Sequence, residues 1–119
     1  METLFITLTE LIANAHLWHF QTFNEPEHRT LGKLYEGTQD IMDSIIEQWM
    51  GKNDNRIRVT TANRIELVNY STTSDIVNRL DKIVKLLDLE ASRYGLDIQN
   101  TILDMKNLIN VTKYKLTFV

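Results

Sequence analysis

The sequence predicts an all-α protein, a bundle of four helices, and three observations support this. Four segments carry apolar residues at spacings of three and four, which is the period of an amphipathic helix. The 119 residues include only four glycines and one proline, Pro26, so a fold of many short strands and tight turns is disfavoured. The length fits a single domain, residues 1–119, built around one core.

The first two helices are expected to form a hairpin. The first is predicted over about residues 3–22. The second is predicted over about residues 25–50, where Asn24 and Glu27 have the spacing of a capping box. Gly51 is expected to end the second helix, because glycine adopts the left-handed conformation that commonly closes a helix.

Two glycines lie inside the second predicted helix, Gly32 and Gly37. Each weakens a helix interior by about 1 kcal/mol relative to alanine. They are therefore expected to permit close packing against a neighbouring helix.

Residues 51–72 break the helical pattern and separate the second helix from a second pair. Helix three is expected over about residues 73–94 and helix four over about residues 96–116, with Gly95 between them. Antiparallel neighbours need a connection of only a few residues, so a segment of about 20 residues predicts a crossover along the bundle. A hairpin, a long crossover and a second hairpin make the ferritin-like arrangement of a four-helix bundle.

The composition excludes several classes of function. The chain has no cysteine, which removes disulfides, thiolate metal sites and cysteine nucleophiles. A formal net charge of −3 gives no general attraction to nucleic acid or anionic membranes. No apolar run approaches the roughly 20 residues that span a bilayer, and no signal peptide is evident, so a cytoplasmic location is expected. No motif marks a phosphate loop or a serine nucleophile, and no catalytic residue is predicted.

Three histidines and two acids in the first hairpin suggest a metal site. His16 and His28 flank the turn, and Asp43 and Glu47 lie one helical turn apart. Imidazole nitrogen and carboxylate oxygen are the ligands that iron, zinc and similar divalent metals accept. His19 shares a helix face with His16 and could assist it. The alternatives are histidines that hydrogen-bond across the hairpin and acids that form a solvated face.

Helix length limits how these residues could meet. A rise of about 1.5 Å per residue separates His28 from Asp43 by roughly 22 Å, whereas metal–ligand bonds are about 2.0–2.2 Å. Either each end of the helix holds its own site, or two subunits pack their second helices antiparallel. In the second case His16 and His28 of one chain meet Asp43 and Glu47 of the other, which predicts at least a dimer.

A different hypothesis uses the basic residues of the crossover. In this case the chain is a non-catalytic binding protein that sequesters a small nucleotide signal or inhibits a host protein, with arginines on the phosphates and a tyrosine stacked on the base. The residues concerned are Lys52, Arg56, Arg58, Arg64 and Tyr70. Basic residues that only keep a loop soluble, and a purely structural oligomer, remain open.

The first hairpin resembles the starvation-induced ferritin-like (Dps) proteins, which oxidise and store iron. The matching residues are Ala15-His16-Leu17-Trp18, His28, Asp43 and Glu47. The resemblance implies an iron site between two subunits. The family usually has a further acid where this chain has Gly32, so weak ferroxidase activity is the enzymatic option and non-enzymatic metal binding is preferred.

Nearly the whole chain is also similar to small tailed-phage proteins of unknown function with a ferritin-like core. The matching residues are His16, His19, Thr22, His28, Leu31, Tyr35, Asp43, Glu47, Gly51, Asn100, Asp104, Tyr114 and Leu116. This resemblance implies a viral protein acting in the host cytoplasm, where the sequestering hypothesis would give it an anti-defence role.

Overall fold

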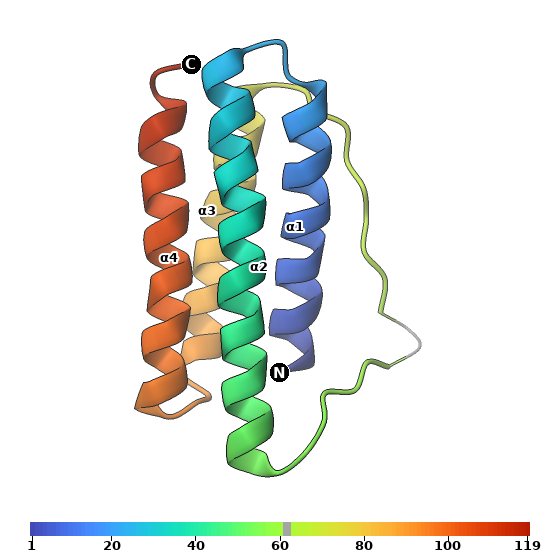
Figure 1. Cartoon of the computed structure of the whole chain (residues 1–119), viewed down its shortest axis with the longest axis vertical. Helices are drawn as coiled ribbons and strands as arrows, with labels where there is room; N and C mark the ends of the chain where they lie inside the picture. The colour runs from blue at the N-terminus through green and yellow to red at the C-terminus, as the bar shows by residue number, and fades with distance from the viewer. Residues whose placement is uncertain (61–62) are drawn as a thin grey trace.

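The computed structural model describes residues 1–60 and 63–119, and these form four helices and no strand (Figure 1). The helices are α1 (Glu2–Gln21), α2 (Glu25–Asn53), α3 (Thr73–Ala91) and α4 (Leu96–Leu116). The predicted all-α four-helix bundle is confirmed. Of the expected crossover, residues 61–62 lie outside the described part.

The chain folds as two antiparallel hairpins joined by a long connection. After α2, the connection runs back along the bundle beside α1, and α3 starts at the end where α1 stops (Figure 1). As a result α2 and α3 run in the same direction. The order of hairpin, crossover and hairpin is the one that the spacing of the helical segments predicts.

Two helix ends differ from the prediction. The second helix passes Gly51 and ends at Asn53, and its C-cap residue, Asp54, has a left-handed conformation with φ of 46° and ψ of 49°. Aspartate tolerates this conformation better than most residues, so glycine was not needed at the end. The third helix stops at Ala91, before the expected Tyr94.

Side-chain caps fix two helix starts. The Asn24 side chain accepts a hydrogen bond from the Glu27 backbone N–H at 3.0 Å, as the capping box predicts. At the start of α3, the Thr72 hydroxyl accepts from the Asp75 backbone N–H at 3.0 Å.

One apolar cluster joins all four helices. Its fully buried members share the three- and four-residue spacing seen in the sequence: Leu4, Leu8, Ala15, Leu31, Leu34, Ile45, Ile76, Leu80, Leu87, Ile102, Met105 and Ile109. In the described part of the chain, no helix has the length and apolar character needed to cross a membrane.

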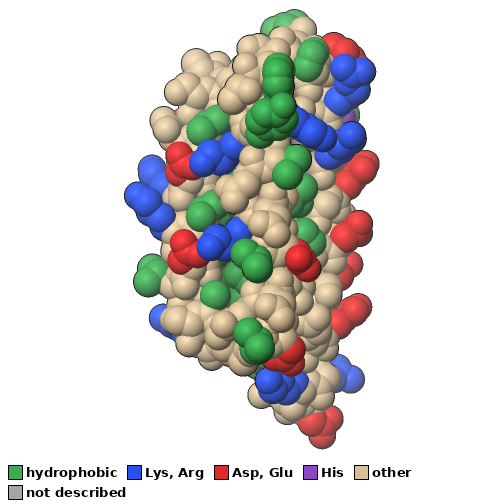
Figure 2. Space-filling view, turned by 90° about the vertical axis from the view of Figure 1, so that its left-hand side faces the viewer, with side chains coloured by type: hydrophobic (Ala, Val, Ile, Leu, Met, Phe, Trp, Pro, Cys, Tyr) green, Lys and Arg blue, Asp and Glu red, His purple; other side chains and the backbone are tan. Residues whose placement is uncertain are grey.

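The outer face of α3 and α4 combines ion pairs with exposed apolar side chains (Figure 2). Lys106 pairs with Asp88 and Lys113 pairs with Asp81, so two lysines of α4 bridge to α3. Figure 2 also shows a column of acidic side chains at its right-hand edge, the side on which α2 lies.

Candidate functional site

Two histidines tie α1 to α2 by reciprocal hydrogen bonds. His19 Nδ1 lies 2.6 Å from the His28 carbonyl oxygen, and His28 Nδ1 lies 2.6 Å from the His19 carbonyl oxygen. A carbonyl can only accept, so each Nδ1 carries a proton and donates it. The rings stack with centroids 3.7 Å apart and planes inclined by 18°. We call this pair the histidine clamp.

Gly32 makes room for the clamp. A Cβ atom at this position would lie 3.1 Å from His19 Cε1 and 3.2 Å from His19 Nδ1. A side chain at position 32, including the acid of the Dps pattern, would therefore press against the His19 ring, which would have to shift. At Gly37 a Cβ would lie 2.9 Å from Leu108 Cδ2 of α4. Both glycines thus permit close packing, as predicted.

The stacking limits what the clamp can bind. A metal bonds imidazole nitrogen along the lone pair, which lies in the ring plane. Two nearly parallel rings 3.7 Å apart cannot both point their lone pairs at one ion. In this conformation His19 and His28 do not chelate a metal together. Each still has an Nε2 atom that the carbonyl hydrogen bonds do not use.

His16 is placed differently from the other two histidines. Its ring is exposed and stacks on Tyr35, with centroids 4.3 Å apart, and lies 4.8 Å from the Phe20 ring. Among the residues that the structure describes, neither ring nitrogen has a hydrogen-bond partner. Of the predicted ligands, His16 is therefore the histidine most available to an external ion.

Asp43 and Glu47 belong to a longer row of exposed acids on α2. Together with Glu36 and Asp40 they recur at spacings of three and four, so all four project from one face. None of them forms an ion pair within the described residues. We call these four residues the α2 acidic stripe.

One chain does not bring the predicted metal ligands together. His16 packs at the level of Tyr35, and eight residues of α2 place Asp43 about 12 Å further along the helix. Over residues 1–60 and 63–119, no group of three or more histidines and acids is close enough to hold an ion. A metal site at these residues would require a second subunit.

The basic residues of the alternative hypothesis are also spread out. Arg56, Arg58 and Arg64 are exposed along the crossover, and Lys52 pairs with Asp97 at 3.2 Å. Tyr70 packs against the core. Lys52 lines a surface pocket together with Trp49, Arg93 and Tyr94, and none of the three crossover arginines lines that pocket.

Two buried polar residues, Glu27 and Asn14, connect separate parts of the chain in ways that the sequence did not indicate. Glu27 is 1% exposed and accepts hydrogen bonds from the hydroxyls of Thr22 and Thr73, so it joins the ends of three helices. A capping box would also have the Glu27 carboxylate accept from the Asn24 N–H, but the Asn24 N–H donates to the Thr22 hydroxyl instead, at 3.1 Å. Asn14 is 5% exposed and bonds the crossover through both ends of its amide, at 2.9 Å to the Glu66 carbonyl and 2.8 Å from the Val68 N–H.

The fold and these clusters define a small four-helix-bundle protein with one long crossover. A family model described as "Family of unknown function (DUF5856)" matches residues 19–116, and the chain belongs to this family. The match begins at His19, the α1 member of the histidine clamp, and contains the whole of α2, α3 and α4. No match was found among curated proteins or among solved structures.

Proposed function

We propose that the protein is a divalent-metal-binding homo-oligomer, at least a dimer, whose metal sites form between the α1–α2 faces of two subunits. One observation carries this proposal. The α2 acidic stripe has no ion-pair partner in the described chain, and on α1 the exposed His16 makes no hydrogen bond through its ring nitrogens to any described residue.

The stripe is electrostatically unfavourable by itself. Its three neighbouring like-charge pairs are separated by three or four residues, and each such pair costs a helix about 0.2–0.5 kcal/mol. A bound divalent cation removes this repulsion. Imidazole with carboxylates is a ligand set suited to zinc, iron or manganese.

An antiparallel pair of α2 helices brings the two kinds of ligand together. With a twofold axis near Gln39, Asp43 of the partner subunit falls at the level of Tyr35, where His16 packs. Glu47 of the partner subunit then falls near the level of Leu31, within one turn of His28. The twofold axis generates two equivalent sites.

This arrangement couples metal binding to assembly. Without a cation, two acidic stripes face each other and repel. When cations bind, their positive charge neutralises the stripes. The shared ligands then hold the dimer together. His16 is the principal histidine, His28 adds its Nε2, and His19 supports the His28 ring. We expect no ferroxidase turnover, because position 32 is a glycine and supplies no carboxylate ligand.

The test measures metal content and mass on the same sample. Protein stripped with EDTA is incubated with Zn²⁺ or, without oxygen, with Fe²⁺, and is then analysed by elemental mass spectrometry and light scattering. We expect a monomer after EDTA and a dimer or larger assembly with about one ion per chain after loading. Metal-free protein of unchanged oligomeric mass would contradict the coupling.

Variants locate the site. His16→Ala and Asp43→Asn should each reduce bound metal and dimer formation by at least roughly tenfold, since each removes a ligand. Asp104→Asn is the matched control, because it removes one exposed carboxylate from α4. Normal metal content in His16→Ala would exclude the shared site.

A further inference from the structure

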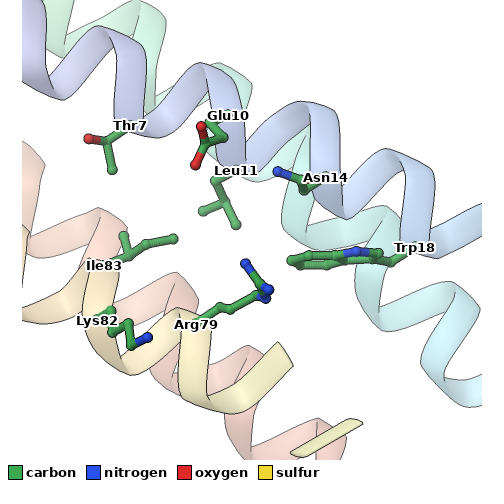
Figure 3. A pocket seen from close by; sticks show the side chains of 8 residues that line it. All are labelled: Thr7, Glu10, Leu11, Asn14, Trp18, Arg79, Lys82 and Ile83. Carbon is green, nitrogen blue, oxygen red and sulfur yellow. The ribbon is translucent and has the colours of Figure 1, made fainter. Parts of the chain in front are cut away.

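A cavity of about 180 Å³ lies between α1 and α3, and no histidine lines it (Figure 3). Side chains of both helices point into it (Figure 3). Its volume is below the roughly 300–1,000 Å³ of drug-sized sites. The volume of this cavity therefore suits a small molecule.

The α3 wall of the cavity is cationic. Arg79 donates from Nε to Asp75 at 3.0 Å, which holds one edge of its guanidinium. The Nη atoms of Arg79 and the ammonium of Lys82 have no ion pair or hydrogen bond within the described chain. These donors remain available to a carboxylate.

The α1 wall carries the opposite charge. One carboxylate oxygen of Glu10 accepts a hydrogen bond from the Glu66 backbone N–H at 3.0 Å. No ion pair joins Glu10 to Arg79 or to Lys82. Opposite charges therefore face each other across the cavity without meeting, and they leave room for a molecule that bears both.

The remaining surface is apolar. Leu11 and Trp18 are buried and Ile83 is half-buried. The Trp18 indole N–H donates to the Val68 carbonyl at 2.7 Å, so the ring offers only its apolar surface to the cavity.

We propose that this cavity binds a small zwitterion with an apolar substituent, of the α-amino-acid class. The ligand carboxylate meets Arg79 and Lys82, its ammonium meets Glu10, and its apolar group packs on Leu11 and Trp18. Charge-assisted hydrogen bonds at both ends give the site its specificity. This site is independent of the proposed metal site and uses none of its residues.

Fluorescence of Trp18 tests the proposal directly. The chain has two tryptophans, and Trp49→Phe leaves Trp18 as the single reporter in otherwise full-length protein. The probes are L-leucine, 3-methylbutylamine, which lacks the carboxylate, and 4-methylpentanoate, which lacks the amine. We expect a saturable change with L-leucine and binding weaker by roughly tenfold or more for each analogue, because each lacks one charged contact.

Variants that remove one charge test which side chain binds the carboxylate of the ligand and which binds its ammonium group. Arg79→Gln should weaken L-leucine binding by roughly tenfold or more. The matched control is Arg29→Gln, which breaks the same kind of i,i+4 pair with Glu25 on α2. Glu10→Gln, which can still accept from the Glu66 N–H, should weaken L-leucine and leave 4-methylpentanoate unchanged. Circular dichroism of each variant confirms that the helices form.

Three results would overturn the proposal. The first is no saturable change with L-leucine up to about 10 mM, a concentration that would nearly fill a site with a Kd of about 1 mM. The second is 4-methylpentanoate binding as tightly as L-leucine, which would mark a simple anion site. The third is equal weakening by Arg29→Gln and Arg79→Gln.

Discussion

At the scale of single residues, the histidine clamp determines how the first hairpin closes. His19 and His28 each donate a hydrogen bond from Nδ1–H to the other's backbone carbonyl, and the two rings stack. Gly32 admits the His19 ring against α2. The connection between α1 and α2 is only residues 22–24, so the clamp lies where the two helices must be held at a defined separation.

We predict that His28→Ala lowers the free energy of unfolding by about 1–3 kcal/mol, because the His19 carbonyl loses its donor and the His19 ring loses its stacking partner. Urea unfolding followed by circular dichroism measures the change. His16→Ala is the control, since it removes a stacked ring without removing a hydrogen bond. Equal losses in the two variants would contradict a clamp that acts through its hydrogen bonds.

At the scale of secondary-structure elements, α1 both packs into the core and holds the crossover. An extended segment outside a sheet cannot pair its own backbone groups, so other groups must satisfy them. Side chains along one flank of α1 do so, and they bond the crossover at several points: Glu2, Glu10, Asn14, Trp18 and Gln21.

We predict that Asn14→Ala releases the crossover locally. The variant loses two hydrogen bonds, each with a net value of about 1 kcal/mol. Tryptic cleavage after Arg64 should then accelerate by roughly tenfold or more, because each 1.4 kcal/mol of local stability changes the open population tenfold. Gel analysis of a trypsin time course measures the rate.

The control for this experiment is Asn107→Ala, which removes an exposed asparagine from α4. An unchanged cleavage rate after Arg64 in Asn14→Ala would show that the other α1 side chains hold the crossover without Asn14.

At the scale of the whole molecule, polar contacts close the bundle at both ends. At one end the Glu27 carboxylate accepts hydrogen bonds from the hydroxyl of Thr22, which follows α1, and from that of Thr73, the first residue of α3. At the other end Lys52 of α2 pairs with Asp97, in the first turn of α4. A hydrogen bond from the backbone N–H of Ile98 holds the pKa of Asp97 below its usual value of 3.8, and a hydrogen bond from Lys52 lowers it to a smaller extent. A hydrogen bond from Arg79 likewise lowers the pKa of Asp75.

These lowered pKa values predict how stability depends on pH. A carboxyl group whose pKa is lower in the folded state stabilises the fold fully above its unfolded pKa, and this contribution is lost as the pH falls through the folded pKa. Asp97→Asn should therefore be less stable than the wild type at pH 7, and the difference should shrink below about pH 3.8. Urea unfolding at pH 7 and at about pH 3 measures it. The control is Asp104→Asn; a constant difference for Asp97→Asn would contradict the assignment.

Several features could be predicted from the sequence: the four helices, the Asn24 cap on the Glu27 N–H, the single long crossover and the close approach at both internal glycines. These features depend on the spacing of apolar residues, on backbone preferences and on connection length, and all three can be read from the sequence. The ends of α2 and α3, at Asn53 and Ala91, were predicted less accurately, because several neighbouring residues can end the last turn of a helix.

Which side chains come into contact could not be predicted without the tertiary structure. It paired His28 with His19 and left His16 exposed, buried the Glu27 carboxylate, and set Glu10 across a cavity from Arg79. These contacts depend on the register and separation of helices that are far apart in the sequence. Helical spacing indicates the face on which a residue lies, but only the packing of one helix against another selects its neighbours.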